Sequence, residues 1–185
     1  MSQRERYIGL MSGTSADGVD AVVAQGFEAG GHRGGFMGTP EGALIGTMAL
    51  VPQLVDALDI PVLAAGGIAD ARGVAAAQAL GARGVTVGTA FLLVDECPLS
   101  PAYREALRAA RDADSTLTRA FSGRLARGVA NRVTHELDGV DMPAFPQPNA
   151  ASRPLRQAAA KARRSASQSG WSSSQYRMSS YTWRP

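Results

Sequence analysis

Between residues 20 and 90, apolar residues gather in short continuous runs that are separated by helix-like stretches. Three runs have the length and composition of buried strands, and they lie at 20–24, 61–65 and 84–87. From Gly46 to Leu58, apolar residues recur three and four positions apart, which is the period of a helix. Ala71–Leu80 is an alanine-rich second helix that ends at Gly81. This alternation predicts βαβ units around a parallel sheet.

The predicted strands are apolar throughout rather than alternating, so we expect both faces of the sheet to be covered. A further helix is predicted at Pro101–Arg111. The pattern predicts an α/β fold and fits either a doubly wound sheet or a (β/α)₈ barrel. Only three strands of a barrel are recognisable, so the strands at 20–24 and 84–87 would lack neighbours. We therefore expect self-association through these open barrel edges.

Composition divides the chain into four segments. Residues 1–19 are rich in Gly, Ser and Thr after one apolar stretch, and residues 20–135 carry the predicted βαβ units. Residues 136–164 contain several prolines and a short basic helix candidate, Leu155–Arg164. Residues 165–185 are serine-rich and have no hydrophobic period, so we predict a disordered tail there.

Charge is distributed unevenly along the chain, whose formal net charge is +3. Residues 1–150 carry 12 basic and 16 acidic residues, a net of −4, while 151–185 hold seven basic residues and no acidic ones. The basic tail has no nucleic-acid-binding motif, so no nucleic-acid partner is predicted. No apolar stretch approaches the ~20 residues of a membrane span, and no signal peptide is recognisable. Cys97 has no second cysteine to pair with, and we expect a cytoplasmic protein.

Glycines follow two neighbouring predicted strands, at the edge where parallel α/β folds bind their ligands. Gly66 and Gly67 come after the strand at 61–65, and Gly88 and Thr89 come after the strand at 84–87. Glycine permits positive φ and leaves backbone N–H groups accessible to a phosphate. A single Gly-Gly pair would favour an ordinary tight turn, whereas two such loops one βα unit apart favour a phosphate site.

His32 lies in the glycine-rich stretch 26–34, just after the first predicted strand. An imidazole can take a proton from a carbon acid at physiological pH, although a loop histidine alone is more often without a catalytic role. His135 lies in a polar stretch and is interpreted as a surface residue. No clustered carboxylates or second histidine stand near His32 in the sequence, so no metal site is predicted.

Four motifs resemble those of the nitronate monooxygenase family, whose members were formerly called 2-nitropropane dioxygenases. In chain order they are Gln25–Gly34 (QGFEAGGHRG), Pro61–Asp70 (PVLAAGGIAD), Gly84–Leu92 (GVTVGTAFL) and Leu117–Arg124 (LTRAFSGR). The resemblance extends over residues 20–164, and the order of the motifs makes a chance similarity implausible.

The resemblance implies the C-terminal half of an FMN-binding (β/α)₈ barrel, that is, a partial TIM barrel. The residues implied to hold the FMN phosphate are Gly66, Gly67, Gly88 and Thr89, and those implied to lie near the flavin are Gln25, Gly30 and Gly31. His32 would be the catalytic base that removes the α-proton of a nitroalkane or assists the nitronate. The implied substrates are nitronates or nitroalkanes and O₂, and the implied products are a carbonyl compound and nitrite.

Residues 7–22 (YIGLMSGTSADGVDAV) carry a different resemblance, to the opening of anhydro-N-acetylmuramic acid kinase. In that family Gly13–Asp20 would be an ATP-phosphate loop. The resemblance ends by residue 23, and nothing further along the chain resembles the rest of such a kinase. The two resemblances overlap at Gly18–Val23, which indicates a fusion or assembly junction.

Two alternatives remain beside the monooxygenase interpretation. Barrels resembling dihydroorotate dehydrogenase or IMP dehydrogenase also end in Gly-Gly and Gly-Thr loops, but they lack the motif Ala29–Gly34 at this place. The other alternative is a non-catalytic barrel fragment, because the N-terminal half of the barrel is not recognisable. Because that half is missing, we expect the isolated chain to bind FMN weakly or not at all unless it pairs with a second half-barrel.

Overall fold

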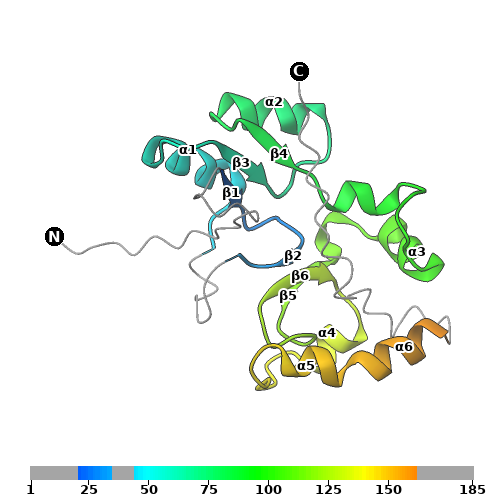
Figure 1. Ribbon diagram of the computed structural model, residues 1–185. Coiled ribbons are helices and arrows are strands. Elements are labelled where there is room, and N and C mark those ends of the chain that lie inside the picture. The colour runs from blue at the N-terminus through cyan, green and yellow to red at the C-terminus, as the bar shows by residue number, and fades with distance from the viewer. Residues whose placement is uncertain (1–20, 35–43, 162–185) are drawn as a thin grey trace. The chain divides into compact units, whose positions relative to one another are not determined.

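The computed structural model describes residues 21–34 and 44–161 (Figure 1). The kinase-like segment 1–19 and the predicted disordered tail 165–185 lie outside the described residues. Contacts divide the described residues into two compact units, of which the first holds 21–29, 33–34 and 44–88 and the second holds 30–32 and 89–161. The main boundary between the units therefore lies at 88/89. The segment boundaries expected from the sequence, at 19, 135 and 164, stay predictions.

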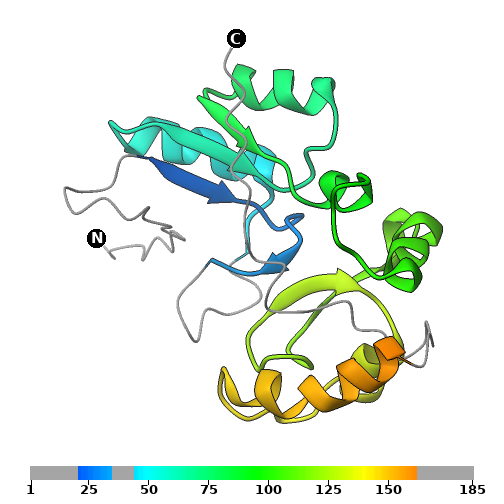
Figure 2. The same cartoon turned by 45° about the vertical axis from the view of Figure 1, so that its right-hand side comes forward.

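The first unit is built around a three-stranded parallel sheet in the order β1-β3-β4 (Figures 1 and 2). Its elements are β1 (Val22–Gln25), α1 (Thr47–Ala57), β3 (Val62–Ala65), α2 (Ala71–Ala79) and β4 (Gly84–Thr86). The three predicted strands and the two predicted helices are confirmed, each within a few residues. Their succession is two βαβ units, so the carboxyl ends of the three strands meet at one edge of the sheet.

The core of the first unit lies between the sheet and its helices. Its buried members are Val22, Ala24, Val51, Leu54, Val62, Ala64, Ala77 and Ala82. Helix α1 contacts both β1 and β3, because its apolar residues recur at helical spacing and face the sheet. Helix α2 contacts β4, and its buried Ala77 belongs to the same core.

Gly81 ends α2, as the sequence predicts, and the structure shows why glycine is needed there. Its φ is +92°, a backbone angle that residues with a side chain rarely adopt. A Cβ at this position would also lie 2.8 Å from Val55 Cγ1. The N–H of Gly81 bonds to Gln78 O, closing the last turn of the helix.

The second unit contains a three-stranded antiparallel sheet in the order β2-β6-β5. Its elements are β2 (Gly31–His32), η2 (Thr89–Leu93), α3 (Pro101–Ala109), η3 (Asp112–Asp114), β5 (Ser115–Thr118), β6 (Ala126–Val129), α4 (Arg132–Glu136), α5 (Gln147–Ala151) and α6 (Arg153–Lys161). Helices α3 and α6 confirm the predicted helices at 101–111 and 155–164, with α6 starting two residues earlier. The antiparallel sheet was not predicted, because β2 has two residues and β5 is largely polar, so neither has a hydrophobic period.

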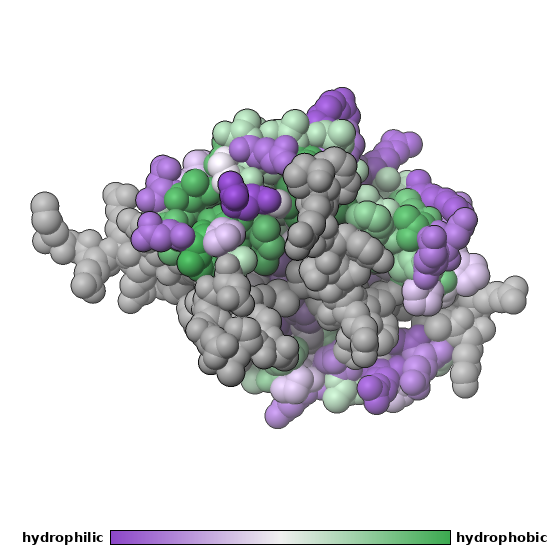
Figure 3. Space-filling model, turned by 45° about the horizontal axis from the view of Figure 1, so that its top comes forward, coloured by the Kyte–Doolittle hydropathy of each residue, from purple (hydrophilic) through white to green (hydrophobic). Residues whose placement is uncertain are grey.

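Several large apolar side chains are exposed in each unit, and Figure 3 shows apolar residues at the surface among polar ones. In the first unit these are Phe27, Ile45 and Met48, and Met48 is 70% exposed. Strands β1 and β4 are the outer strands of the sheet among the described residues. Self-association through these edges stays a prediction. None of the helices described here is long and apolar enough to cross a membrane.

Two residues one turn apart on α1, one buried and one exposed, provide a test of this core. Val51 is completely buried and Met48, one turn earlier, is largely exposed. We expect Val51→Ala to lower the free energy of unfolding by about 2 kcal/mol, because it removes two buried methyl groups and leaves a cavity. Met48→Ala should change it by less than about 0.5 kcal/mol. Urea denaturation of the full chain, followed by circular dichroism, measures both; equal effects would contradict the assigned orientation of α1.

Candidate active site

The three predicted phosphate-binding glycines lie at the carboxyl edge of the first unit's sheet. Gly66 and Gly67 directly follow β3, with φ angles of +118° and +70°. Gly88 lies two residues after the end of β4. A Cβ built on Gly88 meets no heavy atom within 4 Å among the described residues, so the space beside its backbone is open.

Backbone donors at this edge are available to a ligand. The N–H groups of Gly67 and Gly88 donate to no acceptor within the part of the chain that the structure describes. Gly67 is also exposed to solvent. Accessible N–H groups in glycine-rich loops after parallel strands are the groups with which α/β folds bind phosphate. The residues present therefore fit the phosphate of a flavin nucleotide.

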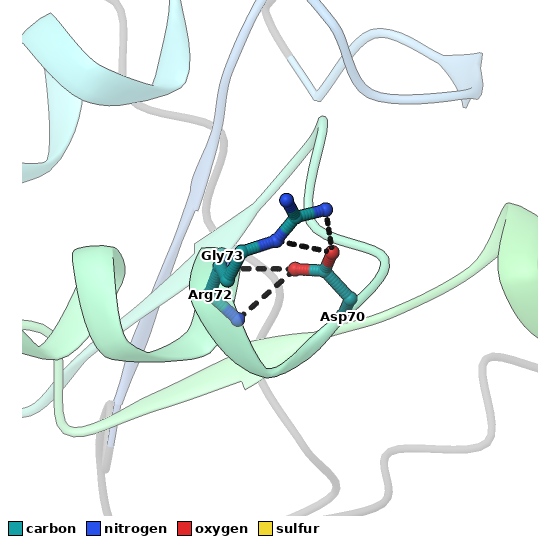
Figure 4. Close-up of polar contacts among 3 residues, drawn as sticks. All are labelled: Asp70, Arg72 and Gly73. Atoms are coloured by element: carbon teal, nitrogen blue, oxygen red, sulfur yellow. Dashed lines mark hydrogen bonds and ion pairs between the residues drawn. The ribbon is translucent and has the colours of Figure 1, made fainter.

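The N-terminus of α2 is occupied by the chain's own carboxylate (Figure 4). Asp70 accepts hydrogen bonds from the N–H groups of Arg72 and Gly73 at 3.0 and 3.1 Å, and it pairs with the Arg72 guanidinium at 2.5 Å. The Arg72 side chain, followed by the Gly73 N–H, holds the pKa of this carboxyl below its usual 3.8. A phosphate would therefore meet the strand-end glycines rather than these two N–H groups of α2.

Helix α1 is capped in the same way, by a carboxylate from another part of the chain. Glu28 Oε2 accepts hydrogen bonds from the N–H and the Oγ1 of Thr47, at 2.9 and 2.8 Å. The preceding residue, Gly46, has no side chain that could cap the helix. Both helix N-termini at this edge thus carry internal anions, which favours the β3 and β4 loops as the place for an external one.

The loop after β1 is fixed by a buried arginine. Arg33, 6% exposed, donates to Gly26 O at 3.1 Å, to Phe27 O at 3.2 Å and to Ala29 O. These carbonyl groups neutralise part of the buried charge and hold the loop in one conformation. Gln25, predicted to lie near the flavin, accepts a hydrogen bond from Gly34 N–H through Oε1 at 2.6 Å. Gln25 therefore closes the loop at its base.

His32, the predicted base, lies in the second unit beside a buried serine and a phenylalanine. Its Nε2 is 2.7 Å from Ser122 Oγ, and Ser122 is 2% exposed. The imidazole and the Phe145 ring meet edge to face, with centroids 6.0 Å apart. Gly123, with a φ of +76°, allows the turn after Ser122 to approach Pro143, since a Cβ would lie 2.3 Å from Pro143 O.

The contacts of Ser122 favour one tautomer of His32. Ser122 Oγ accepts a hydrogen bond from Arg124 N–H at 3.3 Å and lies 3.2 Å from Arg124 O, which can only accept. A hydroxyl has one hydrogen, and all three contacts are satisfied together only if that hydrogen goes to Arg124 O. In that arrangement Nε2 of His32 is the donor. In the neutral imidazole, the basic lone pair consequently belongs to Nδ1.

The remaining predicted residues also fall in the second unit. Thr89 begins η2, and its Oγ1 would lie 3.2 Å from a Cβ built on Gly30, so these two residues are neighbours. Gly31, with a φ of +81°, pairs with Arg127 across the β2–β6 ladder. The structure thus gathers Gln25, Gly66, Gly67 and Gly88 in one unit and Gly30, Gly31, His32 and Thr89 in the other.

Ser122 and Thr47 are the site residues that sequence reasoning missed. Ser122 lies within a recognised motif, Leu117–Arg124, but its partner His32 is 90 residues away.

His135 is exposed, as expected. No group of three or more metal-binding side chains occurs in the described ranges.

Comparison with known proteins gives consistent matches. A family model described as "Nitronate monooxygenase" matches residues 9–181. A "Probable nitronate monooxygenase" of Staphylococcus aureus (strain Newman) is 49% identical over 147 residues, which cover 77% of this chain and 41% of the relative. Among solved structures, nitroalkane oxidase from Streptomyces ansochromogenes matches with a TM-score of 0.78 and 42% identity, covering 86% of this chain and 47% of that one. FabK from Thermotoga maritima matches with a TM-score of 0.61 and 35% identity, covering 77% and 43%.

These matches confirm the predicted family resemblance and the predicted partial barrel. The chain spans about two fifths of the length of the curated relatives it matches. The kinase resemblance of residues 7–22 finds no support, and the monooxygenase match already includes residue 9. A short glycine-rich stretch of small and acidic residues is too common a pattern to identify a kinase by itself.

The ion pair of Asp70 gives a pH-dependent prediction. Because folding lowers its pKa, the Asp70 charge stabilises the protein above the unfolded pKa near 3.8, and this contribution is lost as pH falls through the folded value. Asp70→Asn keeps a capping side chain but loses the charge. We expect the variant to melt below the wild type at neutral pH and the two to converge in acid and in high salt. A constant difference in thermal midpoint from pH 7 down to pH 3 would contradict this assignment.

The tautomer of His32 can be measured directly. We expect ¹⁵N-edited NMR at about pH 9, where an ordinary histidine with a pKa of about 6.5 is neutral, to show His32 as the Nε2–H form. Ser122→Ala removes the acceptor for that hydrogen and should give a mixture of tautomers, while exposed His135 keeps its spectrum. An Nδ1–H form of His32 in the wild type would contradict the hydrogen-bond assignment.

Proposed function

We propose, from the premise that the chain belongs to the nitronate monooxygenase family, that it binds FMN and takes part in the oxidation of nitronates. The family is one of flavin enzymes. The substrates we assign are nitronates or nitroalkanes and O₂, and the products are a carbonyl compound and nitrite. The observation that carries the proposal is the 2.7 Å contact between His32 Nε2 and buried Ser122, because it prepares a base for proton removal.

The cofactor would be held mainly through its phosphate. The N–H groups of Gly67 and Gly88 would donate to it, and Thr89, which directly follows Gly88, would add a further N–H and a hydroxyl. Gln25, Gly30 and Gly31 would lie near the flavin ring. When bound, FMN supplies an acceptor for the electron that leaves the nitronate.

His32 would remove the proton from the carbon next to the nitro group. That carbon is acidic because the nitro group takes up the negative charge of the resulting nitronate. With Nε2–H donated to Ser122, the neutral ring presents its basic lone pair at Nδ1. After it takes up the proton, the ring is a cation, and the Ser122 oxygen, fixed by Arg124, continues to accept from Nε2–H and stabilises that charge.

Ser122 would also fix the orientation of the ring. Its own position is set by the Arg124 backbone on one side and by close packing of Gly123 on the other. A base that is held in one orientation needs less rearrangement when the substrate arrives.

We expect this chemistry to occur in the cytoplasm, and we expect copies of the chain to associate through the β1 and β4 edges.

The two histidines provide a matched test of the base. We expect His32→Gln to lower the rate of nitrite release from a neutral nitroalkane at least about 100-fold, because proton removal loses its base. A preformed nitronate, which has already lost that proton, should be affected less. His135→Gln, at an exposed position on α4, should stay within about twofold of the wild type for both substrates. The assay uses the full chain with saturating FMN under air.

Two results would contradict the proposal. Equal losses of nitrite release in His32→Gln and His135→Gln would contradict the assignment of His32 as the base. A wild-type chain that binds FMN yet releases no nitrite from either substrate would instead support the non-catalytic alternative.

A further inference from the structure

We propose that Thr47 is a positioning residue for the cofactor phosphate, because its hydroxyl orients and polarises the Gly66–Gly67 peptide. This inference deepens the proposed function and rests on it for the identity of the ligand. Thr47 lies at the start of α1 and is not itself a phosphate contact. Its side chain is 9% exposed and reaches from the helix to the end of β3.

Thr47 lies where three chain segments meet in the first unit. Its Oγ1 is 2.9 Å from Gly66 O, 3.4 Å from Ala65 O and 2.8 Å from Glu28 Oε2. Gly26 packs directly on it, since a Cβ there would lie 2.0 Å from Oγ1. The loop after β1, the start of α1 and the end of β3 are thus joined at one hydroxyl group.

The direction of the Gly67 N–H follows from the contact between Thr47 Oγ1 and Gly66 O. The Gly66–Gly67 peptide is trans, so its C=O and its N–H point in opposite directions. Thr47 holds the C=O from the interior, and the N–H therefore points away from Thr47. Gly67 is exposed, and within the described residues its N–H meets no acceptor, so it faces the space that a phosphate would take. The positive φ angles of Gly66 and Gly67 make this peptide orientation accessible.

The hydroxyl of Thr47 has two acceptors at nearly equal distance but only one hydrogen. Glu28 Oε2 already accepts the Thr47 N–H, so the carboxylate keeps a partner whichever way the hydroxyl turns. An anion at the Gly67 N–H would draw electron density through the peptide and make Gly66 O a better acceptor. Because hydrogen bonds in a chain strengthen one another, phosphate binding and donation by Thr47 to Gly66 O would then be coupled.

The alternative role for Thr47 is purely structural, as a helix-starting residue that fills space. Such a role would be retained by valine, which has nearly the same shape, apart from a general loss of stability. Coupling to the phosphate requires the hydroxyl and would be retained by serine. The two substitutions therefore separate the roles.

The test is a titration of the ¹⁵N-labelled full chain with inorganic phosphate, followed through the amide signals of Gly67 and Gly88. In the wild type we expect saturable downfield shifts of both signals. Thr47→Val should weaken phosphate binding about fivefold to tenfold, the effect of one lost hydrogen bond, and reduce the Gly67 shift. Thr47→Ser should bind within about twofold of the wild type.

Thr134→Val is the matched control, because it deletes another buried threonine hydroxyl, in the second unit. That hydroxyl donates to Asn131 O and accepts from Asn131 N–H, within the cap of α4. We expect its phosphate affinity to equal that of the wild type even if its thermal midpoint falls.

The inference is overturned if the wild-type Gly67 signal does not respond to phosphate, or if Thr47→Val binds phosphate as the wild type does. Equal weakening by Thr134→Val would also overturn it, because stability alone would then explain the loss. Nitrite release plays no part in this measurement. A chain without nitronate oxidation can still show the Thr47 effect, so failure of the proposed function is distinguished from failure of this inference.

Discussion

The satisfaction of backbone polar groups at the carboxyl edge of the β1-β3-β4 sheet is the constraint on which the candidate site depends. Two helices start there, and each exposes N–H groups that lack partners within the helix. Glu28 caps α1 and Asp70 caps α2, while Arg33 binds the carbonyl groups of the loop after β1. The N–H groups of Gly67 and Gly88 lie at the same edge and donate to no acceptor within the described residues. These two N–H groups are therefore the donors that we propose for an external anion.

In the second unit, a buried side-chain hydroxyl must likewise find hydrogen-bond partners. Ser122 is buried and has one hydrogen and two lone pairs, and the Arg124 backbone occupies all but one lone pair. If the Ser122 hydrogen goes to Arg124 O, His32 supplies the remaining hydrogen from Nε2, and this is the tautomer that we expect. On the proposed function, the requirement that this buried hydroxyl be satisfied would also orient the imidazole for proton removal.

The sequence predicted the elements whose stability is local and missed those that depend on distant partners. The strand at 61–65 and the helix stopped by Gly81 follow from apolar runs and glycine positions, and they were predicted within a few residues. Strand β2 has two residues and forms only because β6 pairs with it, so no periodic signal marks it. Ser122 and Thr47 act through partners 90 and 19 residues away, and nothing in their own neighbourhoods indicates those contacts. The strand-end positions of Gly66, Gly67 and Gly88 were predictable because their spacing repeats with the βα unit, while their role as phosphate ligands stays a prediction.

The most direct measurement of the central claim is equilibrium binding of FMN to the wild type and to Gly88→Val. The structure leaves open space beside Gly88, so a valine there should fit without loss of stability and should block the approach of a phosphate. The account predicts saturable FMN binding by the wild type and at least about tenfold weaker binding by the variant, which corresponds to about 1.4 kcal/mol, with an unchanged thermal midpoint. Equal FMN affinity of the two folded proteins would contradict it.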